Sequence, residues 1–121
     1  MRGIHTSATF VAALVATPAL AEDMPALGDL LGGEVETTTM RYDCGEGGPI
    51  KARYLNGETS SIAIVPIDGE DRLLVNVLSA SGARYVAGVY EWWTKAESAM
   101  LSDLTEPGAI TTCVTKDAGT E

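Results

Sequence analysis

The sequence predicts an all-β domain that folds as an antiparallel barrel or a sandwich. About eight short segments rich in β-branched and aromatic residues follow one another from residue 34 to residue 114. Gly, Asn, Asp and Ser cluster between these segments, as in chains that reverse direction after every strand. Helix-forming residues gather in only one place, residues 94–104. The chain of 121 residues is long enough for one such domain and too short for two.

Turn sequences mark the hairpins between these strands. Asn56-Gly57, the dipeptide most typical of a β-hairpin, follows an alternation of polar and apolar residues, and Asp68-Gly69 marks a second turn. Residues 94–104 have good helix propensity, but their neighbours have β character, so a strand is favoured there and a helix stays the alternative. The predicted strands span residues 34–44, 51–55, 61–67, 72–78, 84–87, 90–94, 99–104 and 109–114.

The N-terminus has the order of a secretory signal peptide. Arg2 and His5 precede the apolar residues 10–16, and Pro18 and a small-residue triplet that ends at Ala21 follow. We expect cleavage after Ala21, with a short buried helix of the domain as the alternative. The apolar run is too short to span a bilayer. Because no cysteine lies near the cleavage site, we expect an exported protein without a lipid anchor.

The predicted organisation has three parts. Residues 1–21 form the signal peptide, and residues 22–33, with one proline and three glycines, form a flexible leader. Residues 34–121 form the β-domain. No repeat and no low-complexity tract interrupts it.

Charge and composition exclude several classes of function. The net charge is −9, and without Arg2 seven basic residues face 17 acidic ones, which gives −10. Binding to nucleic acid or to an anionic membrane is therefore not expected. His5 is the only histidine, so the mature chain can form neither a Ser-His-Asp triad nor a histidine metal site. Two cysteines are too few for a thiolate zinc cluster, and we expect no metal and no cofactor.

Cys44 and Cys113 lie 69 positions apart. They lack the CxxC spacing of a redox motif, and an oxidising compartment favours one structural disulfide between them. Closing a loop of this length adds roughly 4 kcal/mol to stability on the chain-entropy model. That amount matters for a domain with a small core.

Residues 79–95 (SASGARYVAGVYEWWTK) combine three features. The stretch begins with a small-residue turn, which allows close approach of the backbone to a partner. It holds four of the seven aromatic residues, and Lys95 is the only basic residue between Arg84 and Lys116. A lone cation beside aromatic and hydroxyl groups can bind carboxylates. Each feature also has a structural interpretation: a plain turn, core aromatic residues with Trp92 or Trp93 pointing inward, and a solvated surface charge.

In combination these features resemble the MliC/PliC family of membrane-bound or periplasmic inhibitors of C-type lysozyme. The resemblance covers about residues 40–115. Its motifs are Tyr42-Asp43-Cys44, Ser81-Gly82-Ala83-Arg84-Tyr85, Tyr90 followed by Trp93-Thr94-Lys95, and Cys113. It implies an eight-stranded antiparallel β-barrel closed by a disulfide. It also implies a soluble periplasmic inhibitor rather than an enzyme, with C-type lysozyme as the partner.

The resemblance further implies the residues that bind the partner. In that family a serine and a lysine enter the lysozyme cleft and contact its catalytic carboxylates, and the matching residues here are Ser81 and Lys95. Tyr90, Tyr85 and Arg84 are secondary candidates, either as rim contacts or as supports of the two loops. The family motif has Gly after the lysine, whereas this chain has Ala96.

The sequence also leaves open three alternatives to a lysozyme inhibitor. Ser81 and Lys95 are the residue types of a Ser-Lys hydrolase dyad, although the SxxK spacing is absent. An eight-stranded barrel can also hold one small ligand or bind another envelope protein. The third alternative is an exported β-domain that has lost the family's activity through Ala96.

Overall fold

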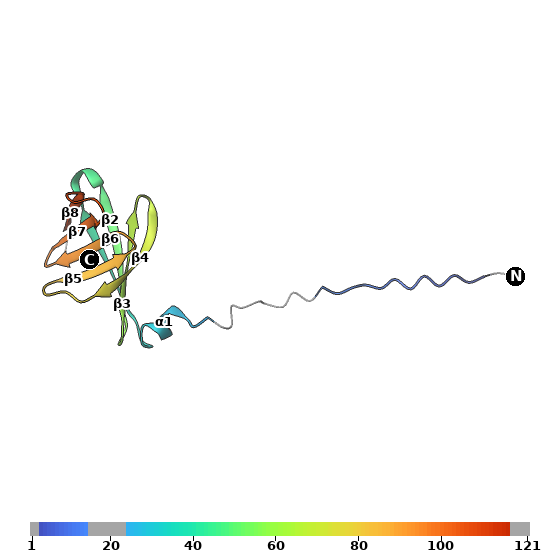
Figure 1. Cartoon of the computed structure of the whole chain (residues 1–121). Coiled ribbons are helices and arrows are strands. Elements are labelled where there is room, and N and C mark those ends of the chain that lie inside the picture. Colours follow the sequence, from blue (N-terminus) through green and yellow to red (C-terminus); the bar gives the residue numbers. More distant parts are fainter. Residues whose placement is uncertain (1–2, 15–23, 117–121) are drawn as a thin grey trace.

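Eight antiparallel strands form a closed barrel in sequence order (Figure 1). The computed structural model describes residues 3–14 and 24–116. Residues 3–14 are exposed and have no regular secondary structure, and the predicted cleavage site at Ala21 lies outside the described residues. The elements are α1 (Leu27–Leu30), β1 (Glu36–Asp43), the 3₁₀ turn η2 (Gly45–Gly47), β2 (Pro49–Asn56), β3 (Ser61–Ile67), β4 (Glu70–Val77), β5 (Ala83–Ala87), β6 (Tyr90–Lys95), β7 (Ser98–Asp103) and β8 (Ile110–Thr115). The predicted all-β class and the eight-stranded barrel are confirmed.

The two predicted hairpin turns differ in detail. Asp68 and Gly69 both have positive φ, 52° and 81°, and they alone connect the paired residues Ile67 and Glu70. This is the two-residue turn that the twist of a hairpin favours. Asn56, in contrast, pairs with Ser61 across a four-residue loop. The Asn-Gly dipeptide therefore predicted the hairpin correctly, but the turn there is not a tight one.

The last part of the predicted leader is docked on the barrel. Leu31 is 3% exposed, and its carbonyl oxygen accepts hydrogen bonds from the amides of Thr59 and Ser60 at 3.0 and 3.3 Å. Gly57 lies directly against it, because a Cβ at this position would overlap the Leu31 carbonyl. The leader expected over residues 22–33 therefore contains an ordered turn of helix, α1, and a buried leucine.

The helical alternative for residues 94–104 is wrong. These residues form the end of β6, a two-residue turn and β7. Ala99 pairs with Thr94 on one side and with Cys113 on the other, and its side chain is fully buried. Pairing on both sides and burial outweigh the intrinsic helix propensity of the segment.

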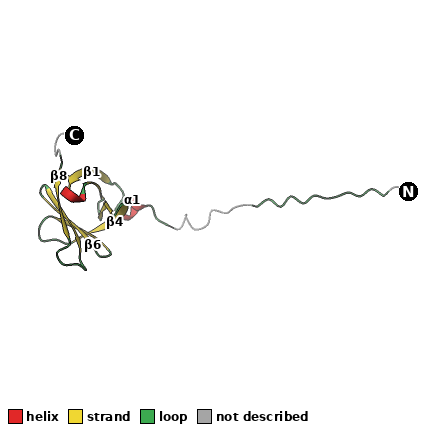
Figure 2. Ribbon diagram, turned by 90° about the horizontal axis from the view of Figure 1, so that it is seen from above, coloured by secondary structure: helices red, strands yellow, loops and turns green. Residues whose placement is uncertain are grey.

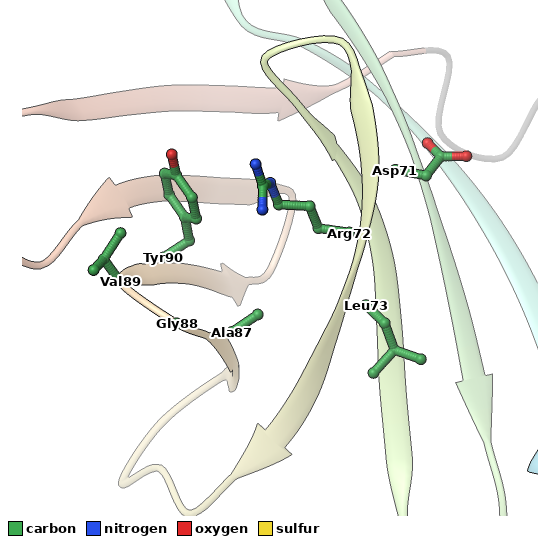
Figure 3. A pocket seen from close by; sticks show the side chains of 7 residues that line it. All are labelled: Asp71, Arg72, Leu73, Ala87, Gly88, Val89 and Tyr90. Atoms are coloured by element: carbon green, nitrogen blue, oxygen red, sulfur yellow. The ribbon is translucent and has the colours of Figure 1, made fainter.

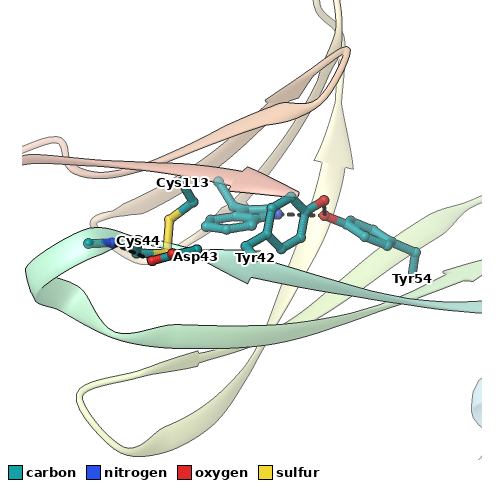
Figure 4. Close-up of a disulfide and its surroundings, with 7 residues drawn as sticks. Tyr42, Asp43, Cys44, Tyr54 and Cys113 are labelled. Carbon is teal, nitrogen blue, oxygen red and sulfur yellow. Dashed lines mark hydrogen bonds between the residues drawn. A yellow bond between two sulfur atoms is a disulfide. The ribbon is translucent and has the colours of Figure 1, made fainter. Parts of the chain in front are cut away.

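Aromatic side chains fill the barrel. Trp92 is fully buried and points inward, and its indole Nε1 donates to the hydroxyl of Tyr54 at 2.8 Å. The hydroxyls of Tyr54 and Tyr42 lie 2.8 Å apart, and the rings of Tyr42 and Trp92 meet edge to face at 5.2 Å (Figure 4). Burial raises the pKa of Tyr42, Tyr54 and Tyr85 above that of a free tyrosine.

A disulfide completes the junction at which the barrel closes. β1 and β8 lie side by side in Figure 2, but only two residue pairs join them, Tyr42 with Thr115 and Asp43 with Val114. Cys44 and Cys113, 6% and 0% exposed, form the disulfide beside these pairs (Figure 4). We call the β1–β8 junction with this disulfide the seam. The predicted disulfide is confirmed.

Candidate partner-binding site

Two connections at one end of the barrel bring Ser81 and Lys95 close together. Residues 78–82 join β4 to β5, and Ala96-Glu97 join β6 to β7. Because neighbouring strands alternate in direction, these two connections lie at the same end. We call residues 78–82 together with residues 95–97 the tip.

Gly82 is the point of contact between the two halves of the tip. Its φ is +65°, and a Cβ there would overlap the Thr94 carbonyl oxygen and lie 3.3 Å from the Cβ of Lys95. A residue with a side chain would have to move away from β6. The small-residue turn therefore does allow a close backbone approach, as expected. The backbone that it approaches is β6 of the same chain.

The backbone at Ser81 is fixed by two hydrogen bonds. Its carbonyl oxygen accepts from the indole Nε1 of Trp93 at 3.0 Å and from the hydroxyl of Ser79. Trp93 is the outward-facing member of the tryptophan pair, and it is half-buried. The Ser81 side chain is exposed, and no hydrogen bond within the described residues engages its hydroxyl. The loop thus holds a free hydroxyl on a fixed backbone.

Lys95 ends β6 as an exposed side chain, opposite Ser98. None of the ion pairs among residues 24–116 involves it. The next residue, Ala96, has a φ of +52°. A glycine adopts this conformation without strain, whereas an alanine does so at a cost. Ala96 nevertheless keeps a two-residue turn, since Lys95 and Ser98 still pair.

Arg84 supports the base of the Ser81 loop. Its guanidinium forms an ion pair with Glu91 on β6, with the Nη2 nitrogen 2.6 Å from the carboxylate oxygen. Its Nη1 donates to the carbonyl oxygen of Leu78 at 3.2 Å. Asn76 in turn donates to the Arg84 carbonyl at 3.0 Å. The Arg84 side chain is thus engaged within the molecule, by Glu91 on one side and by the Leu78 carbonyl on the other.

The structure does not place Tyr85 and Tyr90 at the tip. Tyr85 is 6% exposed and lies in the core with its ring 5.5 Å from that of Tyr54. Tyr90 begins β6, so about 16 Å of strand separates it from Lys95. Neither tyrosine forms a rim around Ser81 and Lys95.

A surface pocket of about 470 Å³ lies near the other end of β6 (Figure 3). In Figure 3 the side chain of Arg72 extends across it, and the guanidinium carbon lies 5.3 Å from the centre of the Tyr90 ring. Asp71 points away from the pocket and pairs with Arg53 at 3.3 Å. The pocket is lined by Asp71, Arg72, Leu73, Ala87, Gly88, Val89 and Tyr90. In the described residues, aromatic side chains belong to the packed interior of the barrel, and the pocket lined by Arg72 and Tyr90 is an open depression on the surface.

The described residues contain no cluster of three or more side chains that could hold a metal ion. None of their helices is long and apolar enough to cross a membrane.

Comparison with known proteins assigns the family. The model of the MliC family, the membrane-bound lysozyme-inhibitor of c-type lysozyme, matches residues 42–109, which is more than half of the chain. This chain belongs to the MliC family. The matched region includes Ser81 and Lys95, and the predicted family is confirmed.

Three relatives bear the name membrane-bound lysozyme inhibitor of C-type lysozyme. The MliC proteins of Cupriavidus necator and Pseudomonas aeruginosa are 45% and 44% identical to this chain over 69 residues, which cover 57% and 56% of this chain. The Escherichia coli K12 protein is 34% identical over 67 residues, or 55% of this chain. These matches cover 55%, 54% and 59% of the relatives' own lengths, so the chain spans little more than half of each.

A solved structure of similar fold shows a relative with its partner. The crystal structure of Pseudomonas aeruginosa MliC in complex with hen egg white lysozyme matches this barrel with a TM-score of 0.60 and 31% sequence identity. The match covers 89% of this chain and 99% of the other. That MliC protein thus shares the barrel and binds a C-type lysozyme.

Proposed function

We propose that this protein inhibits C-type lysozyme by inserting Ser81 and Lys95 into the active-site cleft of the enzyme. The observation that carries the proposal is the contact at Gly82, which joins an exposed hydroxyl and an exposed ammonium group into one tip. Family membership and the MliC complex with lysozyme support the choice of partner. The domain acts as an inhibitor and not as an enzyme.

The chemistry of the tip matches the chemistry of the cleft. Lysozyme cleaves a glycosidic bond between one protonated and one ionised carboxyl group. The ammonium group of Lys95 pairs with the ionised carboxylate and occupies the position where positive charge develops on the sugar. The Ser81 hydroxyl is both a donor and an acceptor, so it can bond the second carboxyl group in either protonation state. Both catalytic groups are then blocked, and their pKa values are shifted.

The acidic surface assists the encounter. Seven basic and 17 acidic residues follow the predicted cleavage site, and C-type lysozymes are basic proteins. Opposite net charges raise the association rate at low salt. Lys95 is a positive charge on this acidic domain. The net charge of the domain steers lysozyme towards it, and Lys95 then binds the carboxylates of lysozyme.

We also propose that the protein is exported and acts in the periplasm as a soluble inhibitor. The order of residues at the N-terminus supports export, and lysozyme reaches its substrate in the same envelope. Mass determination of the protein recovered from the periplasm of a producing cell tests this. A chain that starts at Glu22 is expected, and an uncleaved or lipid-modified chain contradicts the proposal.

A lysis assay tests the proposed function directly. Residues 22–121 are added at rising ratio to a C-type lysozyme that is clearing a peptidoglycan suspension, at low and at moderate salt. We expect stoichiometric inhibition that weakens as salt rises. Lys95→Ala should cost roughly 2–5 kcal/mol of binding, and Ser81→Ala about 1–2 kcal/mol as a lost hydrogen bond.

Lys51→Ala is the matched control, because Lys51 is an exposed lysine on β2. It removes the same charge away from the tip, so its inhibition should stay close to that of the unmodified domain. Failure of the unmodified domain to inhibit at either salt concentration would exclude the proposed function.

A further inference from the structure

Leu78 is the most exposed large apolar side chain in residues 24–116. It is 94% exposed, whereas the other exposed large apolar side chains in this range run from 39% to 76%. The residue lies at the start of the tip, between β4 and Ser81. Its side chain therefore adds nothing to the barrel core, where a buried leucine stabilises a fold.

The backbone beneath Leu78 is nevertheless held in place. Its carbonyl oxygen accepts the hydrogen bond from Arg84 Nη1, and the Arg84 guanidinium is fixed by Glu91 through two bonds of 2.6 and 3.0 Å. The far side of the same loop is fixed by Trp93 through the Ser81 carbonyl. A leucine on a loop held at both ends loses little further freedom when a partner covers it.

Exclusion of water affects the electrostatics of the tip. An ion pair between Lys95 and a carboxylate gains strength when water is excluded from it. Strong contacts at protein interfaces are typically surrounded by contacts that exclude water. Among the exposed residues of the tip, residues 78–82 and 95–97, Leu78 has the largest apolar side chain. It is therefore the group best suited to this role.

We propose that Leu78 is an apolar anchor of the same interface, which packs against the wall of the lysozyme cleft and shields the Lys95 contact from water. The inference rests on the proposed function and adds a specificity element to it. Ser81 and Lys95 recognise the carboxyl groups, whereas Leu78 recognises the apolar surface beside them. A partner with carboxylates but without an adjacent apolar wall would bind less tightly.

Calorimetric titration of a C-type lysozyme with three variants tests the anchor. Leu78→Ser removes the apolar area, Leu78→Met keeps most of it, and Leu104→Ser is the matched control. Leu104 is 56% exposed and lies in the loop between β7 and β8, at the opposite end of the barrel. We expect Leu78→Ser to raise the dissociation constant about tenfold or more. Leu78→Met and Leu104→Ser should stay within about threefold of the unmodified domain.

The outcomes separate the two proposals. Binding by Leu78→Ser within twofold of the unmodified domain would overturn the anchor and leave the proposed function intact. Equal weakening by Leu78→Ser and Leu104→Ser would also overturn it, because the effect would then be a general one of exposed leucines. If the unmodified domain does not bind lysozyme, the proposed function fails and the anchor fails with it. Thermal melting of each variant should show no change, since the side chain is exposed.

Discussion

The seam and the tip hold their residues in opposite ways. At the seam, contacts between buried side chains stabilise the structure. The two cysteines are at most 6% exposed, and Tyr42 packs against Trp92. At the tip, contacts of the backbone at Gly82 and at the Ser81 carbonyl fix the loop. The side chains of Ser81 and Lys95 are exposed to solvent. The first arrangement stabilises the barrel, and the second leaves polar groups available to a partner.

This difference predicts that stability and inhibition can be changed separately. A buried side chain contributes to the free energy of unfolding through the contacts it loses when the chain unfolds. An exposed side chain on a fixed backbone contributes little to that free energy, but it contributes to binding. Variants at the seam should therefore change the melting temperature, and variants that remove the exposed side chain of Ser81 or Lys95 should change inhibition.

The largest expected effect is the loss of the disulfide. Replacing both Cys44 and Cys113 by alanine removes a link across 69 positions, at a cost of about 4 kcal/mol on the chain-entropy model. Only two residue pairs then join β1 to β8, so the barrel opens more easily at the seam. Urea denaturation with and without the disulfide measures the change. A loss below about 1 kcal/mol would show that the short seam is stable without the bond.

The second prediction concerns Gly82. Gly82→Ala places a Cβ against the Thr94 carbonyl and strains a residue with positive φ, so the loop with Ser81 must shift away from Lys95. We expect inhibition to weaken by at least about tenfold, because a shift of this kind separates the two polar groups of the tip.

Gly69→Ala is the control for Gly82→Ala. Gly69 has a φ of +81°, but nothing lies within 4 Å of the Cβ it lacks. Both variants bear the strain of positive φ, about 1 kcal/mol of stability, whereas only Gly82→Ala should lose inhibition. Equal inhibition by the two variants would contradict the proposed role of the Gly82 contact.

The smallest expected effect is a gain of stability at Ala96. Because alanine is strained at a φ of +52°, Ala96→Gly should add about 0.5–1 kcal/mol, a rise of a few degrees in melting temperature. Asp68 has the same φ of 52° at the other end of the barrel, and aspartate tolerates this conformation better than alanine. Asp68→Gly should therefore gain less. Destabilisation by Ala96→Gly would show that the turn after Lys95 does not need a glycine.

The fold was largely predictable from the sequence because short-range patterns specify it. Alternation of side chains placed the strands within two residues of their observed ends, and Asp68-Gly69 predicted its tight turn. The docked leader was not predictable, since it depends on the contact between Leu31 and Gly57, 26 positions apart.

The site was predictable only in part. The spacing of Ser81 and Lys95 was visible in the sequence, but the hydrogen bond from Trp93 and the close contact of Gly82 with β6 are three-dimensional features. Tyr90 was a secondary candidate because it belongs to the motif of the family resemblance that ends at Lys95. A strand separates residues five apart by about 16 Å, and this places Tyr90 near the opposite end.

Direct binding of the tip variants tests most closely whether the tip holds lysozyme. Titration calorimetry compares the affinity of Lys95→Ala and Lys51→Ala for a C-type lysozyme. If binding is concentrated at the tip, Lys95→Ala raises the dissociation constant by about 30-fold or more, and Lys51→Ala changes it by less than about threefold. Similar affinities for the two variants would contradict a binding site at the tip, because lysozyme would then respond to the overall charge of the domain.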